Sequence, residues 1–80
     1  MDPKYFKKNC LILAHLRIDS FDTFILKLNN AIPDKEAGVT KCKEAELVDF
    51  TGNGITNEVF SKIFASFPFT SVTELYLVIF

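Results

Sequence analysis

The stretch that decides the fold covers residues 47–77 and reads LVDFTGNGITNEVFSKIFASFPFTSVTELYL. It starts with a short apolar segment, residues 48–50, which runs into the turn-forming sequence TGNG at 51–54. An amphipathic segment with apolar residues at helical spacing follows and stops at Pro68, because proline cannot continue a helix. A second apolar segment closes the stretch. The pattern predicts a strand, a turn, a helix, a loop and a second strand.

The first half of the chain repeats this order. Residues 10–18 alternate apolar and polar side chains toward their end and predict a strand. Asp19 or Ser20 can then cap a helix that Pro33 ends. The two predicted helices superpose at an offset of 35, which pairs Phe24, Ile25, Lys27, Leu28, Ile32 and Pro33 with Val59, Phe60, Lys62, Ile63, Phe67 and Pro68. One strand and one helix that recur every ~30 residues indicate a solenoid.

A family resemblance supports this interpretation. The pattern Ala45-x-x-Val48-x-Phe50-x-x-Asn53-x-Ile55 resembles the leucine-rich repeat consensus, in which apolar residues at fixed spacing precede an asparagine. The following turn resembles that of ribonuclease-inhibitor-like repeats, and residues 67–77 are similar to the restart in bacterial effector proteins with such repeats. The resemblance is best over residues 45–77. It implies parallel strands and a structural role for Asn53 at the turn.

We therefore expect an α/β fold, a short leucine-rich-repeat-like solenoid of strand-helix units with parallel strands. One small domain over residues 1–80 would hold about two and a half repeats. Its parts would be a lead-in or cap at 1–9, a first unit at 10–44, a second unit at 45–70 and a final strand at 71–80. In this alignment the asparagine position falls on Phe21 in the first unit and on Phe80 in the last.

A second fold stays open at this point. An α+β ferredoxin-like βαββαβ plait would suit a chain of 80 residues. Its strands would lie near 10–18, 38–43, 46–50 and 71–80. Parallel neighbours would favour the repeat, and an antiparallel last strand would favour the plait.

Composition and residue spacing argue against several functional classes. A net charge of −1 provides no basic excess for binding nucleic acid, and no apolar run approaches the ~20 residues of a membrane span. Cys10 and Cys42 lack the short spacing of metal ligands, and no recognised spacing places a nucleophile or acid near His15, the single histidine. We expect no catalytic residues, metal or cofactor. The expected location is the cytoplasm or, for a secreted bacterial effector, a host cell.

The repeat interpretation also predicts a binding surface. The inward-pointing side chains of the three strands are expected to be those of Leu16-x-Ile18, Val48-x-Phe50 and Leu75-x-Leu77. The residues that alternate with these inward positions are then exposed on the strand face. They are His15, Arg17, Asp19, Leu47, Asp49, Thr51, Glu74, Tyr76 and Val78.

This face predicts a non-enzymatic protein–protein interaction module, a fragment or small member of an effector-like repeat family. Arg17 and Tyr76 are the best anchors by residue type. A homo-oligomer through the 72–80 strand is also expected, because that strand carries no charge after Glu74 and would expose an unprotected edge. The alternative is a small ferredoxin-like domain that binds a ligand or assembles with itself.

Overall fold

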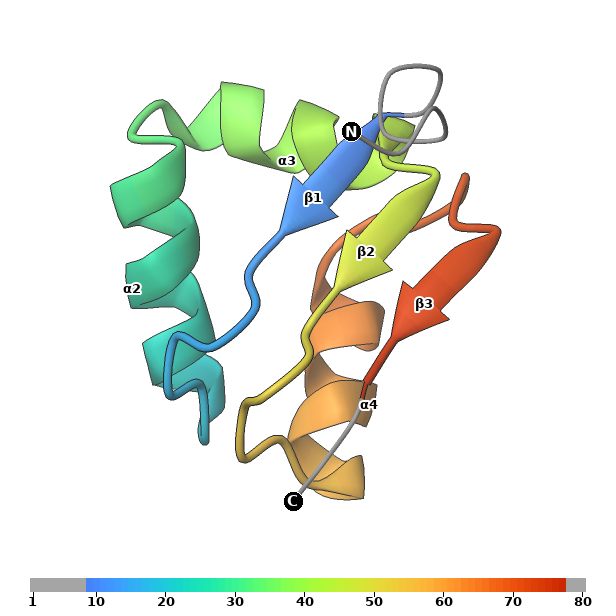
Figure 1. The fold of residues 1–80 in the computed structure, drawn as a ribbon. Coiled ribbons are helices and arrows are strands. Elements are labelled where there is room, and N and C mark those ends of the chain that lie inside the picture. Colours follow the sequence, from blue (N-terminus) through green and yellow to red (C-terminus); the bar gives the residue numbers. More distant parts are fainter. Residues whose placement is uncertain (1–8, 78–80) are drawn as a thin grey trace.

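The structure is a computed structural model that describes residues 9–77. Within these residues the chain forms three strands and three helices (Figure 1). Their order is β1 (Cys10–Ile12), α2 (Phe21–Ala31), α3 (Lys35–Glu44), β2 (Leu47–Asp49), α4 (Asn57–Ser66) and β3 (Glu74–Tyr76). The protein is a small α/β domain, so this part of the expected fold class is confirmed.

The three strands form one parallel sheet in the order β1-β2-β3. In the middle strand, Val48 lies opposite Leu11 on one side and Leu75 on the other. The ladder continues past the end of β1, because the Leu13 N–H donates to the Asp49 carbonyl at 2.8 Å. Of the described strands, β2 alone has a neighbour on both sides.

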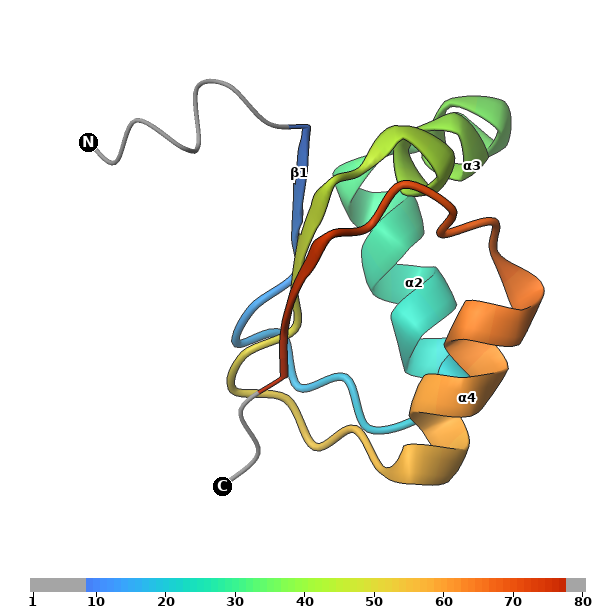
Figure 2. The same cartoon turned by 90° about the vertical axis from the view of Figure 1, so that its right-hand side faces the viewer.

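The two faces of the sheet differ. The three helices lie on one side of it, and no described helix covers the other side (Figure 2). Because side chains alternate along a strand, Leu11, Val48 and Leu75 point toward the helices and the residues between them point away. We call the side without helices the open face. Its strand residues are Cys10, Ile12, Leu47, Asp49, Glu74 and Tyr76.

The ferredoxin-like plait is not adopted. It requires a strand near residues 38–43, which lie inside helix α3, and an antiparallel last strand, whereas β3 runs parallel to β2. Helix α3 forms because Asp34 caps it, and its Oδ1 accepts from the backbone N–H groups of Glu36 (2.9 Å) and Ala37 (3.3 Å). Lys41 and Lys43 in the last turn suit the helix dipole.

The first strand is much shorter than the predicted strand over residues 10–18. The chain leaves the sheet after Leu13, because His15 and Arg17 adopt left-handed backbone conformations with φ of 57° and 59°. An extended strand cannot contain such residues. Residues 14–19 therefore form a loop at the carboxyl end of β1.

The register of the sheet also corrects the expected alignment of the two units. Leu11 lies opposite Val48, so the inward pair of the first strand starts at Leu11 and not at Leu16. The position equivalent to the turn asparagine is then Leu16, not Phe21. A polar side chain is missing at this position of the first unit.

The helix boundaries follow the sequence signals. Ser20 and Thr56 are the N-caps of α2 and α4, and each side chain accepts a hydrogen bond from a backbone N–H in the first turn, at 3.1 and 3.3 Å. The C-caps Ile32 and Phe67 come directly before prolines. The last strand covers Glu74–Tyr76 instead of 71–80, and the predicted positions at 78–80 lie outside the described residues.

A single apolar core fills the space between the helices and the sheet. Phe24 from α2 is fully buried, and its ring meets those of Phe50 and Phe67 edge-on at centroid distances of 5.9 and 5.2 Å. Both strand-helix units contribute to it. The buried members are Leu11, Leu13, Ile18, Phe24, Leu28, Cys42, Ala45, Val48, Phe50, Ile55 and Ile63.

Candidate functional site

The predicted binding residues fall into two groups in the structure. Asp49, Glu74 and Tyr76 are half-buried on the open face of the sheet, in the register that the sequence predicts. Ile12 joins them there with 49% of its surface exposed. Sequence reasoning missed Ile12 because it put the inward positions of the first strand at Leu16 and Ile18. The alternation of Leu11 and Leu13 around Ile12 is the signal that could have found it.

The second group lies beyond the carboxyl ends of the strands. His15, Arg17 and Asp19 are exposed as predicted, but they belong to the loop after β1 and not to a strand. Thr51 is half-buried in the loop after β2, where its N–H donates to Asp49 Oδ1 at 2.8 Å. The sequence therefore placed these residues near the ends of the correct strands, but they belong to the following loops and not to the strands.

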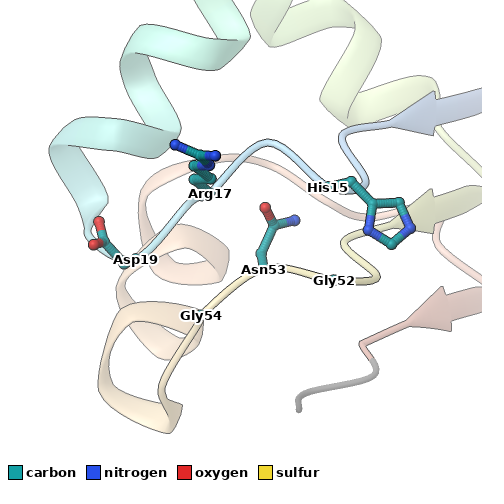
Figure 3. Close-up of a pocket in the computed structure, with 6 residues that line it drawn as sticks. All are labelled: His15, Arg17, Asp19, Gly52, Asn53 and Gly54. Atoms are coloured by element: carbon teal, nitrogen blue, oxygen red, sulfur yellow. The ribbon is translucent and has the colours of Figure 1, made fainter.

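The two loops enclose an open hollow of about 490 Å³ (Figure 3). Gly52 and Gly54, which the sequence indicated only as turn residues, are part of its wall. His15 and Asp19 lie at opposite ends, and Asn53 stands between the loops. The lining residues are His15, Arg17, Asp19, Gly52, Asn53 and Gly54.

Asn53 is the buried polar residue of this region and is 4% exposed. Its Nδ2 donates to the carbonyls of Leu13 (2.8 Å) and Phe50 (2.9 Å). Its Oδ1 accepts from the N–H groups of Leu16 and Ile18, both at 3.0 Å. An asparagine amide offers two donors and two acceptor sites, so every one of them is used. The side chain therefore links the loop after β1 to the loop after β2.

These bonds hold the loop after β1 in a strained conformation. The left-handed backbone costs a residue with a Cβ roughly 1–2 kcal/mol, and both His15 and Arg17 adopt it. The two N–H groups that Asn53 accepts belong to the residues that directly follow them. The amide therefore stabilises a chain path that the local sequence disfavours.

His15 packs directly on Gly52. A Cβ atom at Gly52 would clash with the His15 ring, and the φ of 76° at this glycine also disfavours any other residue. The backbone of the His15 residue is tied to the same loop, since its N–H donates to the Thr51 carbonyl at 2.8 Å. The positive φ and the His15 ring therefore both favour glycine at position 52.

Polar side chains and the backbone of two glycines line the hollow. Within residues 9–77 no hydrogen bond joins the His15 side chain to an acid or a nucleophile, and no three potential ligands are grouped for a metal ion. Both cysteines are thiols. Burial raises the pKa of the Cys42 thiol to about 11, which keeps it protonated and a poor nucleophile at neutral pH.

None of the helices within residues 9–77 is both long and apolar enough to cross a membrane. No protein-family model matches the chain, and neither a curated protein nor a solved structure matches it.

Replacing Asn53 with alanine should destabilise the fold by about 3 kcal/mol or more, because it leaves two N–H groups and two carbonyls without their partner. Urea unfolding followed by circular dichroism measures the change. Asn30→Ala is the matched control, since Asn30 is exposed on α2 and should cost at most about 0.5 kcal/mol. Equal midpoints for the two variants would contradict the role given to Asn53.

Gly52→Ala should cost about 1–2 kcal/mol through its backbone conformation and more through contact with His15. The contact part should disappear when His15→Ala is added, so the double-mutant cycle should show a coupling of roughly 1 kcal/mol. Gly54→Ala is the control, because its Cβ would lie 3.7 Å from Asp19 Cβ, an ordinary contact. A double-mutant cycle without coupling would contradict the contact between the His15 ring and residue 52.

Proposed function

We propose that this chain is a non-enzymatic protein-interaction module that binds a protein partner through the open face of its sheet. The observation that carries the proposal is that the three described helices all lie on the other side of the sheet. Parallel sheets are normally covered on both faces, yet no described helix covers this one. A surface of this kind gains stability when a partner removes it from water.

The residues of the open face suit a protein partner. Ile12 supplies exposed apolar area, and Tyr76 supplies an aromatic ring with a polar end, the kind of residue that dominates binding energy at interfaces. The Tyr76 hydroxyl donates to Glu74 Oε2 at 3.4 Å, and the Asp49 carboxylate is fixed by its bond to the following turn. The described face thus carries apolar area and two carboxylates, with no lysine or arginine on its strands.

The leucine-rich-repeat-like interpretation gains support from burial. The positions that match the repeat consensus, Ala45, Val48, Phe50, Asn53 and Ile55, are each at most 4% exposed. In this interpretation the chain is a short solenoid or a piece of one, similar to effector-type repeats, and the open face corresponds to the strand surface that such arrays use for binding. The all-parallel register favours it over the plait.

We also propose a second contact, between the β3 edge of the sheet and another copy of this chain. β3 is an edge strand of the described sheet, and Leu75, a residue on the helix side, is still 39% exposed. In a repeat array a further strand-helix unit would cover this position. A neighbouring copy that packs against residues 72–77 would do the same.

Replacing Tyr76 or Ile12 with alanine should weaken partner binding at least about ten-fold without lowering stability by more than about 1 kcal/mol, since both side chains point away from the core. A peptide selected from a displayed random library against the full chain serves as the ligand, and titration calorimetry measures its affinity. Leu26→Ala, which removes an equally exposed apolar side chain from α2, should leave the affinity unchanged. Binding that tolerates both open-face variants would refute the proposed surface.

Sedimentation equilibrium tests the second contact. The full chain should associate at high concentration, and Leu75→Glu should shift it toward the monomer by placing a charge in the apolar contact. Val39→Glu is the control, because Val39 is equally exposed but lies on α3. A monomer at every concentration would exclude association through β3.

A further inference from the structure

The helix layer contains a pocket that the apolar core leaves unfilled. Helix α2 packs against both α3 and α4, on the side of the sheet opposite the open face (Figure 2). Between α2, α3 and the end of α4 lies a pocket of about 250 Å³. Its apolar wall is made by Ile25 and Leu28 of α2, Val39 of α3 and the ring of Phe67. The pocket is therefore separate from the open face and from the hollow at the strand ends.

The walls of this pocket are fixed by contacts of the fold. Leu28 is 3% exposed, and the Phe67 ring meets the fully buried Phe24 ring edge-on at a centroid distance of 5.2 Å. On the opposite wall, Asp34 caps α3 by accepting from the Glu36 N–H at 2.9 Å. A ligand that enters a preformed pocket has little protein to order, so more of its contact energy appears as affinity.

Gly38, in the interior of α3, lines the pocket and is buried. Glycine inside a helix lowers stability relative to alanine. A Cβ at this position would come no closer than 3.9 Å to the Ile32 carbonyl oxygen and to Leu28 Cγ, which is ordinary contact, and Gly38 does not have a positive φ. Neither packing nor backbone conformation therefore requires glycine here. The missing Cβ enlarges the pocket at a cost in helix stability, and such a cost is typical of functional sites.

The volume of the pocket sets the size of its ligand. A cavity of roughly 150 Å³ lined by aliphatic and aromatic side chains accepts benzene. The pocket of about 250 Å³ therefore has room for an aromatic ring with a short substituent. A ring placed there would remove the apolar walls from water and contact the Phe67 ring.

Two polar side chains that line the pocket determine the substituent. Lys35 is exposed and Asn29 is half-buried, so both reach solvent at the mouth. Within residues 9–77 no hydrogen bond or ion pair engages the Lys35 ammonium group or the Asn29 amide. The described lining contains no acidic side chain, since neither Asp34 nor Glu36 is part of it. An ammonium group and an amide N–H both donate hydrogen bonds, and a carboxylate accepts from both.

We propose that this pocket binds a small aromatic carboxylate. The ring lies against Leu28, Val39 and Phe67, and the carboxylate accepts hydrogen bonds from Lys35 and Asn29 at the mouth. The domain then has a small-molecule site on its helix side in addition to the sheet face proposed for a protein partner. The site shares no residue with that face or with the β3 edge, so it does not rest on the proposed function.

Titration of the isotope-labelled full chain with phenylacetate, followed through the amide chemical shifts by NMR, tests the site. The shifts should saturate with a Kd of about 1 mM or below, as a ligand of this size allows, and should centre on residues 28–29 and 35–39. Absence of saturation up to about 10 mM overturns the proposal. Saturable shifts confined to other parts of the chain overturn it as well.

The carboxylate contact has its own test. Phenylacetamide, which keeps the ring and loses the charge, should bind at least about ten-fold more weakly than phenylacetate. Lys35→Gln should reduce the affinity for phenylacetate to a similar extent and leave the affinity for phenylacetamide unchanged. Lys43→Gln is the matched control, because Lys43 is exposed on α3 and does not line the pocket. Equal affinities for the two compounds, or equal effects of the two lysine variants, would contradict the assigned role of Lys35.

Gly38→Ala separates a binding site from a packing gap. The added methyl group should raise the melting temperature and weaken phenylacetate binding at least about five-fold, because it occupies space that the ligand needs. Gly54→Ala, outside the pocket, should leave the affinity unchanged. A Gly38→Ala variant that folds and binds within about two-fold of the unmodified chain overturns the site. If this variant does not fold, the exposed Lys35→Gln variant decides.

Tyr76→Ala keeps the test independent of the proposed function. Tyr76 lies on the open face of the sheet, so this variant should bind phenylacetate with unchanged affinity whether or not the open face binds a protein. A loss of phenylacetate binding in Tyr76→Ala would place the ligand on the open face and overturn the pocket on the helix side.

Discussion

The side-chain amide of Asn53 is the interaction on which the rest of the structure depends. It bonds to the two strand ends and to two N–H groups of the loop after β1. That loop contains two residues in a disfavoured conformation and has no polar side chain of its own at the equivalent position, Leu16. The first unit is therefore completed by the second unit, and helix α2 starts directly after this loop, where Ser20 caps it.

This dependence explains why the two units form one body. Phe24 of the first unit packs edge-on against Phe50 and Phe67 of the second. Helices α2, α3 and α4 all follow the same side of the sheet, so the apolar residues of both units meet there and the opposite face remains open. The side of the sheet without helices is thus a consequence of how the core is assembled.

Much of this could be predicted from the sequence where two independent signals agree. Asp19 or Ser20 in the first half and Thr56 in the second precede helical spacing that ends at a proline, so both helices were predicted with a capping region that contains the observed caps, Ser20 and Thr56. Val48 and Phe50 alternate around Asp49, so their position in the core was predicted, whereas Leu47, expected to be exposed, is fully buried. Helix α3 was missed because it is polar on most sides and contains Gly38, which leaves no periodic pattern to recognise.

The first strand shows a different kind of limit. Leu11-x-Leu13 and Leu16-x-Ile18 both alternate, and periodicity alone cannot choose between them. The choice depends on hydrogen bonds from Asn53, a residue in the other half of the chain. For the candidate site, Asp49, Glu74 and Tyr76 were therefore placed on the right face, whereas His15, Arg17 and Asp19 were assigned to a strand that had already ended.

The position of Asn53 directly before Gly54 has a chemical consequence. In an unfolded chain the unhindered glycine nitrogen can attack the asparagine side-chain carbonyl, expel ammonia and form a succinimide, which opens to aspartate or isoaspartate. In the fold the four hydrogen bonds of the amide hold it away from this reaction. Each unfolding event therefore exposes the chain to a covalent change that removes the two donors the fold requires.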